Sequence, residues 1–426
     1  MKQLLQTVRG TSDILPNEQD KWNYVCNKLC ETAQMYGFDE IITPYFEYSW
    51  IYTKGIGEET DIVSKEMYYL RHKDADMDVA LRPEGTAGVV RAYYEHGLHN
   101  KPSPIHLYYL GAMFRHERPQ KGRARQFYQF GVESIGDSSP SEDALIILNA
   151  AQTLNRLGIK SEYYNVEINS LGCKVCRGKY LKKLIKYLSG VSDKLCEQCQ
   201  ARVKSNPLRV LDCKNRICKN ALKNAPIPLD SLCSDCAGHF KLVLEYLEEA
   251  GVKFTINHTL ARGLDYYTRT VFEFISNVGD TKGLAIAAGG RYDNLVAKYG
   301  RKDAPAVGYG LGVERLIKLI DDKNIELPVT KPSVVYIIQL GKSAKKKAFN
   351  VIQELTSAGI YIKSSLSKSS LKSQLKAASK AKAKLALIVG QRELLDNTII
   401  LKDIATGSQE TLDHKNYIPT LIERLK

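Results

Sequence analysis

Two predicted strands with a dense group of cations between them constrain the fold of this chain more than any other stretch. Ile105–Leu110 and Gln126–Phe130 have the β-branched and aromatic content of strands, and the loop between them contains Pro119 and Gly122. The loop cations are Arg115, Arg118, Lys121, Arg123 and Arg125. Guanidinium groups bind phosphate oxygens in pairs, so antiparallel strands with arginines at the base of their loop suit a polyphosphate. Chemistry alone leaves a solvated basic hairpin open as the alternative.

Polar side chains that could contact a ligand accompany these cations. Glu117, Gln129 and Glu133 are expected to face one pocket with them. Upstream, Glu84 and Thr86 of the segment LRPEGT follow another short predicted strand. Their carboxylate and hydroxyl suit an ammonium group, whereas turn formation and helix capping explain the same two residues without a ligand.

Helical spacing and turn residues organise the first part of the chain. Apolar residues recur on one face of a predicted helix that ends at Gly37, and the segment 40–46 reads as a strand interrupted by Pro44, at an edge or a bulge. Ser139 and Glu142 have the spacing of a capping box, with a proline between them at the first helical position. They predict an amphipathic helix that ends near Gly158.

Eight of the ten cysteines fall within 171–253, in four pairs. The pairs are Cys173/Cys176, Cys196/Cys199, Cys213/Cys218 and Cys233/Cys236. Three are CxxC pairs, and the first two pairs have the separation of a four-thiolate zinc site. Disulfides are disfavoured in a reducing cytosol, so Zn²⁺ and buried free thiols are the two readings that stay open.

Two short boxes and a glycine-rich run follow the cysteine-rich region. The boxes are ARGLDYY at 261–267 and AGGRYD at 288–293, and the run GYGLGVER at 308–315 predicts a strand leading into a helix. Gly289 and Gly290 are expected to let the backbone approach a ligand closely.

The last part of the chain is strongly basic. From Lys331 to Lys426 there are 17 Lys and Arg against 7 Asp and Glu, a net +10, while the whole chain carries +14. Continuous apolar strands alternate there with amphipathic helices, which predicts a small open α/β sheet. Such a basic surface indicates a polyanion partner, most simply nucleic acid, although a merely soluble lysine-rich surface explains the charge as well.

Nothing in the sequence indicates a membrane protein. No apolar run has the length that spans a bilayer, and the start of the chain, MKQLLQTVRG, lacks a signal-peptide core. We therefore expect a soluble protein of the cytoplasm without membrane partners.

Taken together, these segments resemble the histidyl-tRNA synthetases, which are class II aminoacyl-tRNA synthetases. FRHERPQKGRARQF at 114–127 is similar to their motif 2, and the run at 308–315 to motif 3. RGLDYY and GGRYD resemble the two boxes that separate these enzymes from other class II synthetases. LRPEGT matches the family's TLRPEGT box except that Ala80 replaces the first threonine, and the helix, strand and proline around Pro44 resemble motif 1, the family's dimer interface.

The resemblance implies an α+β protein with a defined domain order. A class II catalytic domain with an antiparallel sheet would occupy 1–325, with a cysteine-rich helical insertion at 171–253. A linker at 326–332 would lead to an α/β anticodon-binding domain at 333–426. The insertion of this family is not generally regarded as metal-dependent, and motif 1 implies a homodimer.

The implied activity is the ATP-dependent attachment of L-histidine to its cognate tRNA through a histidyl-adenylate, with ATP and Mg²⁺. Neutral imidazole offers one donor and one acceptor, and a pocket with Glu133, Tyr267 and Tyr292 can pair both. Sites of this kind reject analogues strongly, because a wrong substrate leaves buried polar groups unpaired.

The resemblance also assigns roles to single residues. Arg115 and Arg262 would be catalytic, as the two cations beside the α-phosphate of ATP. Phe127 and Arg315 would sandwich the adenine, while Glu117 and Arg123 contact ATP. The implied histidine-binding residues are Glu84, Gly85, Thr86, Arg115, Gln129, Glu133, Arg262, Tyr266, Tyr267 and Tyr292. Arg118 and Gln120 are candidates for meeting the tRNA acceptor end.

Two alternatives belong to other functional classes. A paralogue of this catalytic domain is a non-catalytic regulatory subunit of ATP phosphoribosyltransferase, but it lacks the anticodon-binding domain and several motif residues. A general RNA-binding protein would explain the basic charge, but not the glutamates, glutamine and tyrosines that accompany the arginines.

Overall fold

The computed structural model describes residues 5–58, 60–72, 75–118, 122–211, 213, 215–260, 264, 266–299, 304–329 and 331–425. The chain divides into two compact units, Met1–Pro328 and Val329–Lys426. Among the described residues, no helix combines the length and the apolar character needed to cross a membrane.

An eight-stranded sheet forms the centre of the first unit. Its strand order is β1-β5-β6-β11-β10-β9-β7-β8. The strands are β1 (Asp39–Glu40), β5 (Ile105–Phe114), β6 (Gln126–Ile135), β7 (Tyr164–Ser170), β8 (Thr255–Ile256), β9 (Thr268–Ser276), β10 (Ala285–Arg291) and β11 (Ala306–Gly312). Every neighbouring pair is antiparallel except the two outermost pairs, β1 with β5 and β7 with β8. The predicted α+β class with an antiparallel central sheet is confirmed.

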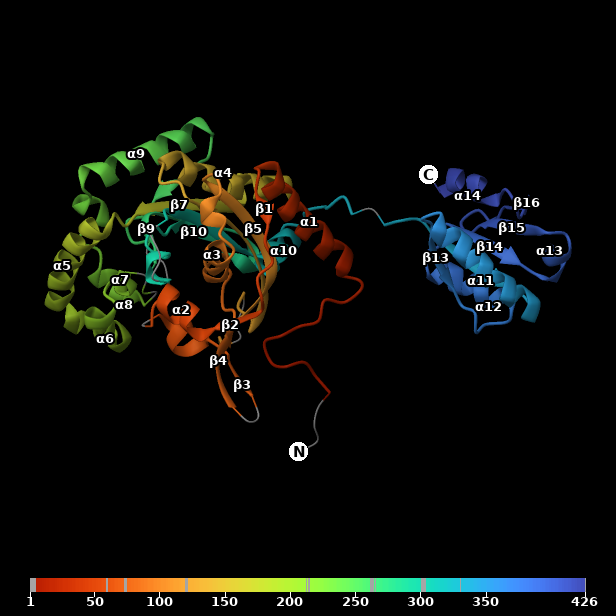
Figure 1. Cartoon of the computed structure of the whole chain (residues 1–426), viewed down its shortest axis with the longest axis horizontal. Helices are drawn as coiled ribbons and strands as arrows, with labels where there is room; N and C mark the ends of the chain where they lie inside the picture. The colour runs from red at the N-terminus through yellow and green to blue at the C-terminus, as the bar shows by residue number, and fades with distance from the viewer. Residues whose placement is uncertain are drawn as a thin grey trace. The chain divides into compact units, whose positions relative to one another are not determined.

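Four helices pack into the larger apolar core of this unit, along one face of the sheet. They are α1 (Gln19–Met35), α4 (Pro140–Arg156), α9 (Ser234–Glu249) and α10 (Val313–Asp322), and α4 runs beside α9 in Figure 1. Strand β6 shows how the sheet separates its two faces: Phe130 and Val132 are fully buried in this core. The residues between them, such as Gly131, therefore point to the opposite face.

The opposite face carries a second core and a small sheet. Helices α2 (Ser49–Ile56) and α3 (Thr86–Glu95) contribute to this core, and the sheet has the order β2-β4-β3. Its strands are β2 (Phe46–Tyr48), β3 (Tyr69–His72) and β4 (Ala75–Leu81). The single interrupted strand predicted at 40–46 is wrong, because the chain leaves one sheet after β1 and enters another at β2. Pro44 lies in the irregular segment between the two sheets.

The predicted capping box at the start of α4 is also wrong. Pro140 is the first residue of the helix as expected, but the Ser139 side chain makes no capping hydrogen bond. The carboxylate of Glu142 turns into the sheet instead, where it accepts a hydrogen bond from Ser134 Oγ at 2.8 Å and contacts His106 Nε2 at 2.6 Å. A buried hydroxyl and an imidazole bind this carboxylate better than a solvent-exposed helix end does.

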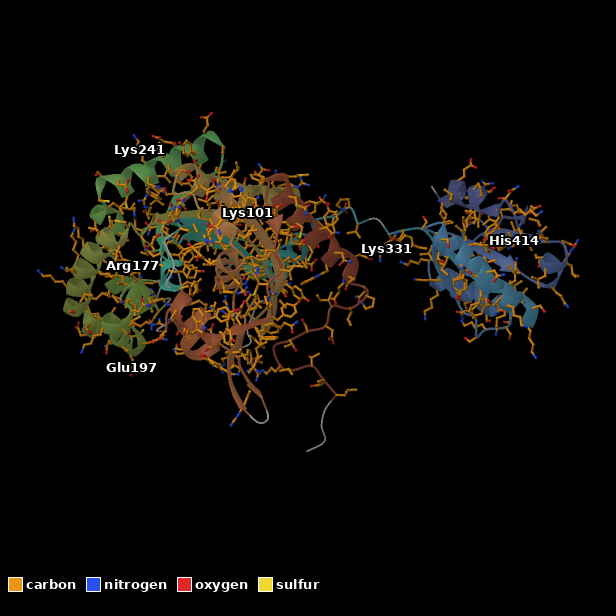
Figure 2. The ribbon with its side chains drawn as sticks, viewed as in Figure 1. Lys101, Arg177, Glu197, Lys241, Lys331 and His414 are labelled. Atoms are coloured by element: carbon orange, nitrogen blue, oxygen red, sulfur yellow. The ribbon has the colours of Figure 1, made fainter. Side chains whose placement is uncertain are left out.

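A helical insertion separates β7 from β9. Its helices are α5 (Lys174–Gly190), α6 (Glu197–Ser205), α7 (Leu208–Leu211), α8 (Arg216–Ala221) and α9. The first four enclose an apolar core of their own, which includes Tyr180, Leu184 and Leu188. Figure 2 shows Arg177 and Glu197 on this insertion.

The second unit has a mixed five-stranded sheet in the order β13-β12-β14-β15-β16. The strands are β12 (Val334–Gln339), β13 (Tyr361–Ser364), β14 (Leu385–Val389), β15 (Thr398–Asp403) and β16 (Gln409–Asp413). The helices are α11 (Lys342–Ser357), α12 (Leu371–Lys380), α13 (Gln391–Leu395) and α14 (Tyr417–Leu425). Apolar cores lie on both faces of this sheet, which is why its central strands read as continuous apolar runs. The sequence did not predict the antiparallel strands β15 and β16.

Candidate active site

Strands β6 and β11 bring motif residues from distant parts of the chain together. Gly308 on β11 lies opposite Glu133 on β6. A Cβ atom at Gly308 would overlap the Glu133 carboxylate, and one at Gly310 would overlap the Gln129 amide. The glycines of the 308–315 run thus leave the space that two polar side chains of the neighbouring strand occupy.

These side chains line a small cavity of about 70 Å³. Its described lining is Glu84, Thr86, Arg115, Gln129, Glu133, Leu264, Tyr266, Tyr267, Ala288, Tyr292, Gly308, Tyr309 and Gly310. The predicted histidine-binding residues that fall within the described part of the chain therefore lie around one space, apart from Gly85. The backbone N–H of Gly85 donates to Gln129 Oε1 at 3.2 Å, so this glycine holds a lining residue from behind.

Glu133 is the central carboxyl group of this cavity. One of its oxygens accepts a hydrogen bond from Thr86 Oγ1 at 2.6 Å, and the other accepts one from the Tyr292 hydroxyl. The side chain is only 1% exposed. Burial raises the pKa of Glu133 to about 8, although the two hydrogen bonds act in the opposite direction and nearby Glu84 adds to the rise.

Three tyrosine rings enclose the same space. Tyr266 lies 4.7 Å from Tyr267 and 5.6 Å from Tyr292 between ring centroids, and all three are buried. Burial raises the pKa of the Tyr266 and Tyr292 hydroxyls well above the ordinary value. These hydroxyls stay protonated and can donate hydrogen bonds, so an aromatic cage with one carboxyl group surrounds the cavity.

Glu84 does the capping work that the sequence left open as its alternative role. Its two oxygens accept the backbone N–H groups of Thr86 and Ala87, each at 2.8 Å, at the start of α3. The side chain is buried, and burial raises its pKa. A carboxylate at a helix N-terminus is stabilised by the helix dipole, and Glu84 also reaches the wall of the small cavity.

A larger cavity of about 680 Å³ adjoins the small one. The two share Arg115, Gln129, Leu264, Ala288 and Gly310 as lining residues. The larger cavity is also lined by the predicted ATP-binding residues Glu117, Arg123, Phe127 and Arg315. The structure thus places one cation, Arg115, at the boundary between the small cavity and the large one.

Backbone carbonyls and carboxylates hold the cations of the larger cavity in place. Arg115 Nε donates to Pro83 O at 2.8 Å, and its guanidinium carbon lies 5.2 Å from the centre of the Phe127 ring. Arg123 forms an ion pair of 3.1 Å with Glu117. Arg315 donates to Gly122 O and Ala285 O, both at 2.9 Å. Burial lowers the pKa of Arg315, with the Arg115 charge the next cause.

The sequence interpretation missed several charged residues of the larger cavity. Glu314, directly before Arg315, accepts the backbone N–H of Tyr128 at 2.8 Å, and burial raises its pKa to about 7. Its position within the 308–315 run was the available signal. Asp61 and Arg209 also line this cavity, and they had no sequence signal, because Arg209 comes from α7 of the insertion.

Comparison with known proteins agrees with this geometry. The family model described as histidyl-tRNA synthetase matches residues 10–316, and the one described as anticodon binding domain matches residues 334–424. The chain belongs to the histidyl-tRNA synthetase family.

Members of the family are similar along their full length. The histidine–tRNA ligase of Halothermothrix orenii is 44% identical over 411 residues, covering 96% of this chain and 97% of the relative. That of Clostridioides difficile is 41% identical over 425 residues and covers 99% of both chains. The solved structure of the apo histidyl-tRNA synthetase of S. aureus has a TM-score of 0.81 at 32% identity, covering 99% of this chain and 100% of that one.

Part of the predicted synthetase site lies outside the described residues. This applies to Arg262 of the RGLDYY box and to Gln120 of the motif 2 loop. Arg118 is described and exposed, and it is absent from the described lining of both cavities.

The GGRYD box of this synthetase is more structural than the sequence suggested. Arg291 is fully buried and forms ion pairs with Asp143 and Asp293, and the same two terminal nitrogens also donate to the backbone oxygens of Asp137 and Ser139. Of the five residues, Tyr292 contacts the cavity. The expectation for Gly289 is wrong in its cause, because a Cβ there would meet Gly308 O of the neighbouring strand rather than a ligand.

The cysteines of the synthetase insertion form two groups of four. Cys173, Cys176, Cys233 and Cys236 make an outer cluster, and Cys196, Cys199, Cys213 and Cys218 an inner cluster. Within each cluster the sulfur atoms lie within 4.8 Å of one another. A single site made of the first two pairs is therefore wrong: the fold combines the first pair with the last, and the second with the third.

Proposed function

We propose that the chain is a histidine–tRNA ligase that activates L-histidine with ATP and transfers it to the histidine tRNA. The observation that carries this assignment is the junction of the two cavities. An aromatic cage with a buried carboxyl group, suited to imidazole, opens at Arg115 into a cation-lined cavity suited to a nucleotide. Family membership supports the same activity.

In the first step the histidine carboxylate attacks the α-phosphorus of ATP. An oxygen–phosphorus bond forms, the bond to the β-phosphate oxygen breaks, and pyrophosphate leaves. Charge develops on the α-phosphate as this happens, and Arg115 lies where both substrates meet. Its guanidinium is already fixed by Pro83 O and the Phe127 ring, so it stabilises this charge without reorganising.

In the second step the 3′-terminal ribose hydroxyl of the tRNA attacks the carbonyl carbon of the adenylate, and AMP leaves. We assign Glu133 with Tyr267 and Tyr292 to the imidazole, and Glu84, Thr86 and Gln129 to the α-ammonium group. Glu117, Arg123, Phe127 and Arg315 are assigned to ATP. We also keep Arg262 as a second catalytic cation, and Arg118 and Gln120 as contacts of the acceptor end, on the strength of the motif match.

The carboxylates of the larger cavity fit the Mg²⁺ that class II synthetases generally use with ATP. Glu66, Glu117, Glu273 and Glu314 line it, and carboxylate oxygen is the ligand that Mg²⁺ prefers. The pKa of Glu66 is raised by burial and by the nearby charge of Glu117, so a divalent cation would relieve this repulsion. When bound, Mg²⁺ would neutralise phosphate charge, while the residues themselves hold the nucleotide. In the insertion, Zn²⁺ is the structural metal that four thiols within bonding reach would hold.

We assign the second unit to tRNA binding at the anticodon. Its net charge of +10 supplies affinity for a phosphate backbone that does not depend on base sequence. Its presence also counts against the regulatory alternative, which predicts that this domain is lacking.

We further propose that the protein is a cytoplasmic homodimer. Ile42, Phe46 and Tyr48, beside the motif 1 proline, are 81%, 54% and 62% exposed in the single chain. Phe46 and Tyr48 point to the same side of β2, since Glu47 between them is buried. A second copy would cover such apolar side chains. All ten cysteines are free thiols, which suits a reducing compartment.

ATP–pyrophosphate exchange with each amino acid in turn tests the activity and its specificity together. We expect exchange with histidine alone, in the absence of tRNA. Glu133→Gln should raise the KM for histidine about 5- to 100-fold, because a mismatched buried hydrogen-bonding group costs about 1–3 kcal/mol, and leave the KM for ATP within about twofold. Glu249→Gln, an exposed carboxylate of α9, is the matched control. No exchange with any amino acid would overturn the assignment.

A further inference from the structure

The two thiol clusters of the insertion have the geometry of two separate metal sites. Tetrahedral zinc with Zn–S bonds of about 2.3 Å requires sulfur atoms about 3.8 Å apart. Cys173 Sγ and Cys176 Sγ are 3.6 Å apart in the outer cluster, and Cys196 Sγ and Cys213 Sγ are 3.9 Å apart in the inner one. A disulfide needs about 2.05 Å, so these sulfur atoms are spaced for a shared ion rather than for a bond to each other.

Backbone N–H groups point at the sulfur atoms across each cluster. Cys173 N donates to Cys236 Sγ at 3.3 Å and Cys233 N to Cys176 Sγ at 3.0 Å, while Cys196 N donates to Cys218 Sγ at 3.2 Å. Such donors stabilise thiolates, and they link the two halves of a cluster in the arrangement that a second shell around a metal takes.

Helix N-termini supply the same preference for thiolate. Cys173, Cys196 and Cys233 are the N-cap residues of α5, α6 and α9, and the second cysteine of each CxxC pair lies one turn later. The second cysteine of each CxxC pair is buried, whereas the N-cap cysteine is only partly buried. The partial positive charge at a helix N-terminus favours the deprotonated sulfur that binds metal.

The inner cluster lies between the two halves of the outer cluster in the sequence, and the two clusters hold different helices together. The outer cluster joins the beginning of α5 to the beginning of α9, beside the cavity tyrosines: Arg177 donates to Tyr267 O at 3.4 Å, and Arg269 donates to Asp235 at 2.8 Å. The inner cluster lies entirely between these ends. It brackets α6 and α7, which carry Arg202 and Arg209.

These two arginines bind one carboxylate outside the insertion, that of Asp61. Arg202 and Arg209 both donate to Asp61 Oδ2, the former at 3.1 Å, and all three side chains are 20–29% exposed. Arg209 and Asp61 line the larger cavity. Helices α6 and α7 also pack into the apolar core of the insertion, and the inner cluster closes the segment that carries both arginines.

We propose that the insertion binds two Zn²⁺ ions, one in the outer and one in the inner cluster, and that the inner ion positions Arg209 at the nucleotide cavity. The second clause rests on the proposed ligase function, whereas the first does not. Each site would carry four thiolate ligands with no open position, which is the pattern of a structural rather than a catalytic zinc.

Metal content measured by mass spectrometry tests the number of sites and their pairing. The wild-type chain, isolated with added Zn²⁺, should hold two ions; one ion, none, or iron in place of zinc would overturn the proposal. Two matched quadruple variants decide the pairing. Replacement of Cys173, Cys176, Cys233 and Cys236 by serine should leave one ion, and replacement of Cys173, Cys176, Cys196 and Cys199 by serine should leave none. The reverse result would show that the first two pairs share an ion. Cys30→Ser, outside both clusters, should keep two.

A measurement on the wild-type protein covers the case in which the quadruple variants do not fold. A chelator removes zinc stepwise, and alkylation shows which cysteines become reactive at each step. The four outer cysteines should become reactive together with the loss of one ion, and the four inner cysteines together with the loss of the other. Exposure of a set drawn from both clusters, or of all eight with a single ion, would contradict two separate sites.

Kinetics test the positioning of Arg209 separately. Cys199→Ser/Cys213→Ser and Arg209→Ala should each raise the KM for ATP about two- to fivefold, as expected for loss of a partly exposed ion pair, with the KM for histidine unchanged. An unchanged KM for ATP in the zinc-depleted inner variant would refute the positioning role while leaving both zinc sites standing. Absence of exchange in the wild type would instead mean that the ligase assignment fails.

Discussion

Glu133 shows how much one buried carboxyl group depends on small neighbours. Its oxygens fit between the Thr86 and Tyr292 hydroxyls because Gly308 opposite has no side chain. The alternation of strand β6 was enough to predict that Gln129 and Glu133 share a face, since side chains two apart point the same way. The reason for the glycine was not predictable, because it depends on which strand lies next to β6.

The raised pKa of Glu133 predicts a pH-dependent stability. Its pKa is about 8 in the folded chain and about 4.3 when unfolded, so the folded state keeps a proton that the unfolded state loses between these values. Proton binding to Glu133 therefore favours folding fully below pH 4.3, and this contribution declines as the pH rises to about 8.

Thermal unfolding of wild type and Glu133→Gln between pH 5 and 9 checks this. We expect the Tm of the wild type to fall relative to the variant up to about pH 8 and then to run parallel to it. The comparison cancels the contributions of all titrating groups that both proteins share to the pH dependence of the Tm. One such group is Asp143, whose pKa is lowered by His239 and Arg291. Parallel curves across the whole range would contradict a buried neutral Glu133.

The space left by Gly308 predicts a steric effect. Gly308→Ala should push the Glu133 carboxylate out of its position, raising the KM for histidine at least tenfold and lowering the Tm. Gly178→Ala is the matched control, because a Cβ at this position on α5 meets nothing within 4 Å. The control should stabilise its helix by about 0.5–1 kcal/mol. Equal KM values for the two variants would show that the glycine is not needed for the pocket.

Elements were predicted well where one face is apolar over several turns, and poorly where a distant partner decides. The helices before Gly37 and after Pro140 came from spacing alone. The capping role predicted for Glu142 was wrong because Ser134 and His106 compete for its carboxylate. The pairing of the cysteines was not predictable, because spacing shows neither which helices meet nor that one cluster lies inside the other. The fold class and the family were predicted from several short motifs, because together these motifs resemble those of one family whose fold is known.

Docking of the insertion at Asp61 is the interaction to test at this scale. Asp61→Asn should release Arg202 and Arg209 and raise the KM for ATP about two- to fivefold, with little effect on histidine. Lys65→Ala is the control, since Lys65 binds the other oxygen of Asp61 at 3.0 Å and does not line the cavity among the described residues. Initial rates at varied ATP, with histidine saturating, give the comparison. A similar effect of both variants would mean that the arginines are not the relevant partners.

At the scale of the whole molecule, the net positive charge and the exposed apolar side chains at 42–48 lie in different units. The second unit holds +10 of the net +14, and the apolar side chains at 42–48 belong to the first. Phe46→Asp should convert a dimer to a monomer in light scattering after gel filtration, because a charge in an apolar interface loses its hydration. Tyr361→Asp, an equally exposed aromatic residue of the second unit, should leave the dimer intact. A monomeric wild type would contradict the proposed interface.

The outer cluster has a consequence for how the molecule is made. Strands β7 and β9 are neighbours in the sheet, yet the ribosome releases the whole insertion between them. All four inner cysteines emerge before Cys233, so the insertion can close around its own core while the last four strands of the large sheet, β8 to β11, are still unmade. When Cys233 and Cys236 then join Cys173 and Cys176, the two ends of the insertion are held together at the outer cluster. The entropy cost of closing the long loop between β7 and β9 is then already met, so it no longer opposes the pairing of these strands.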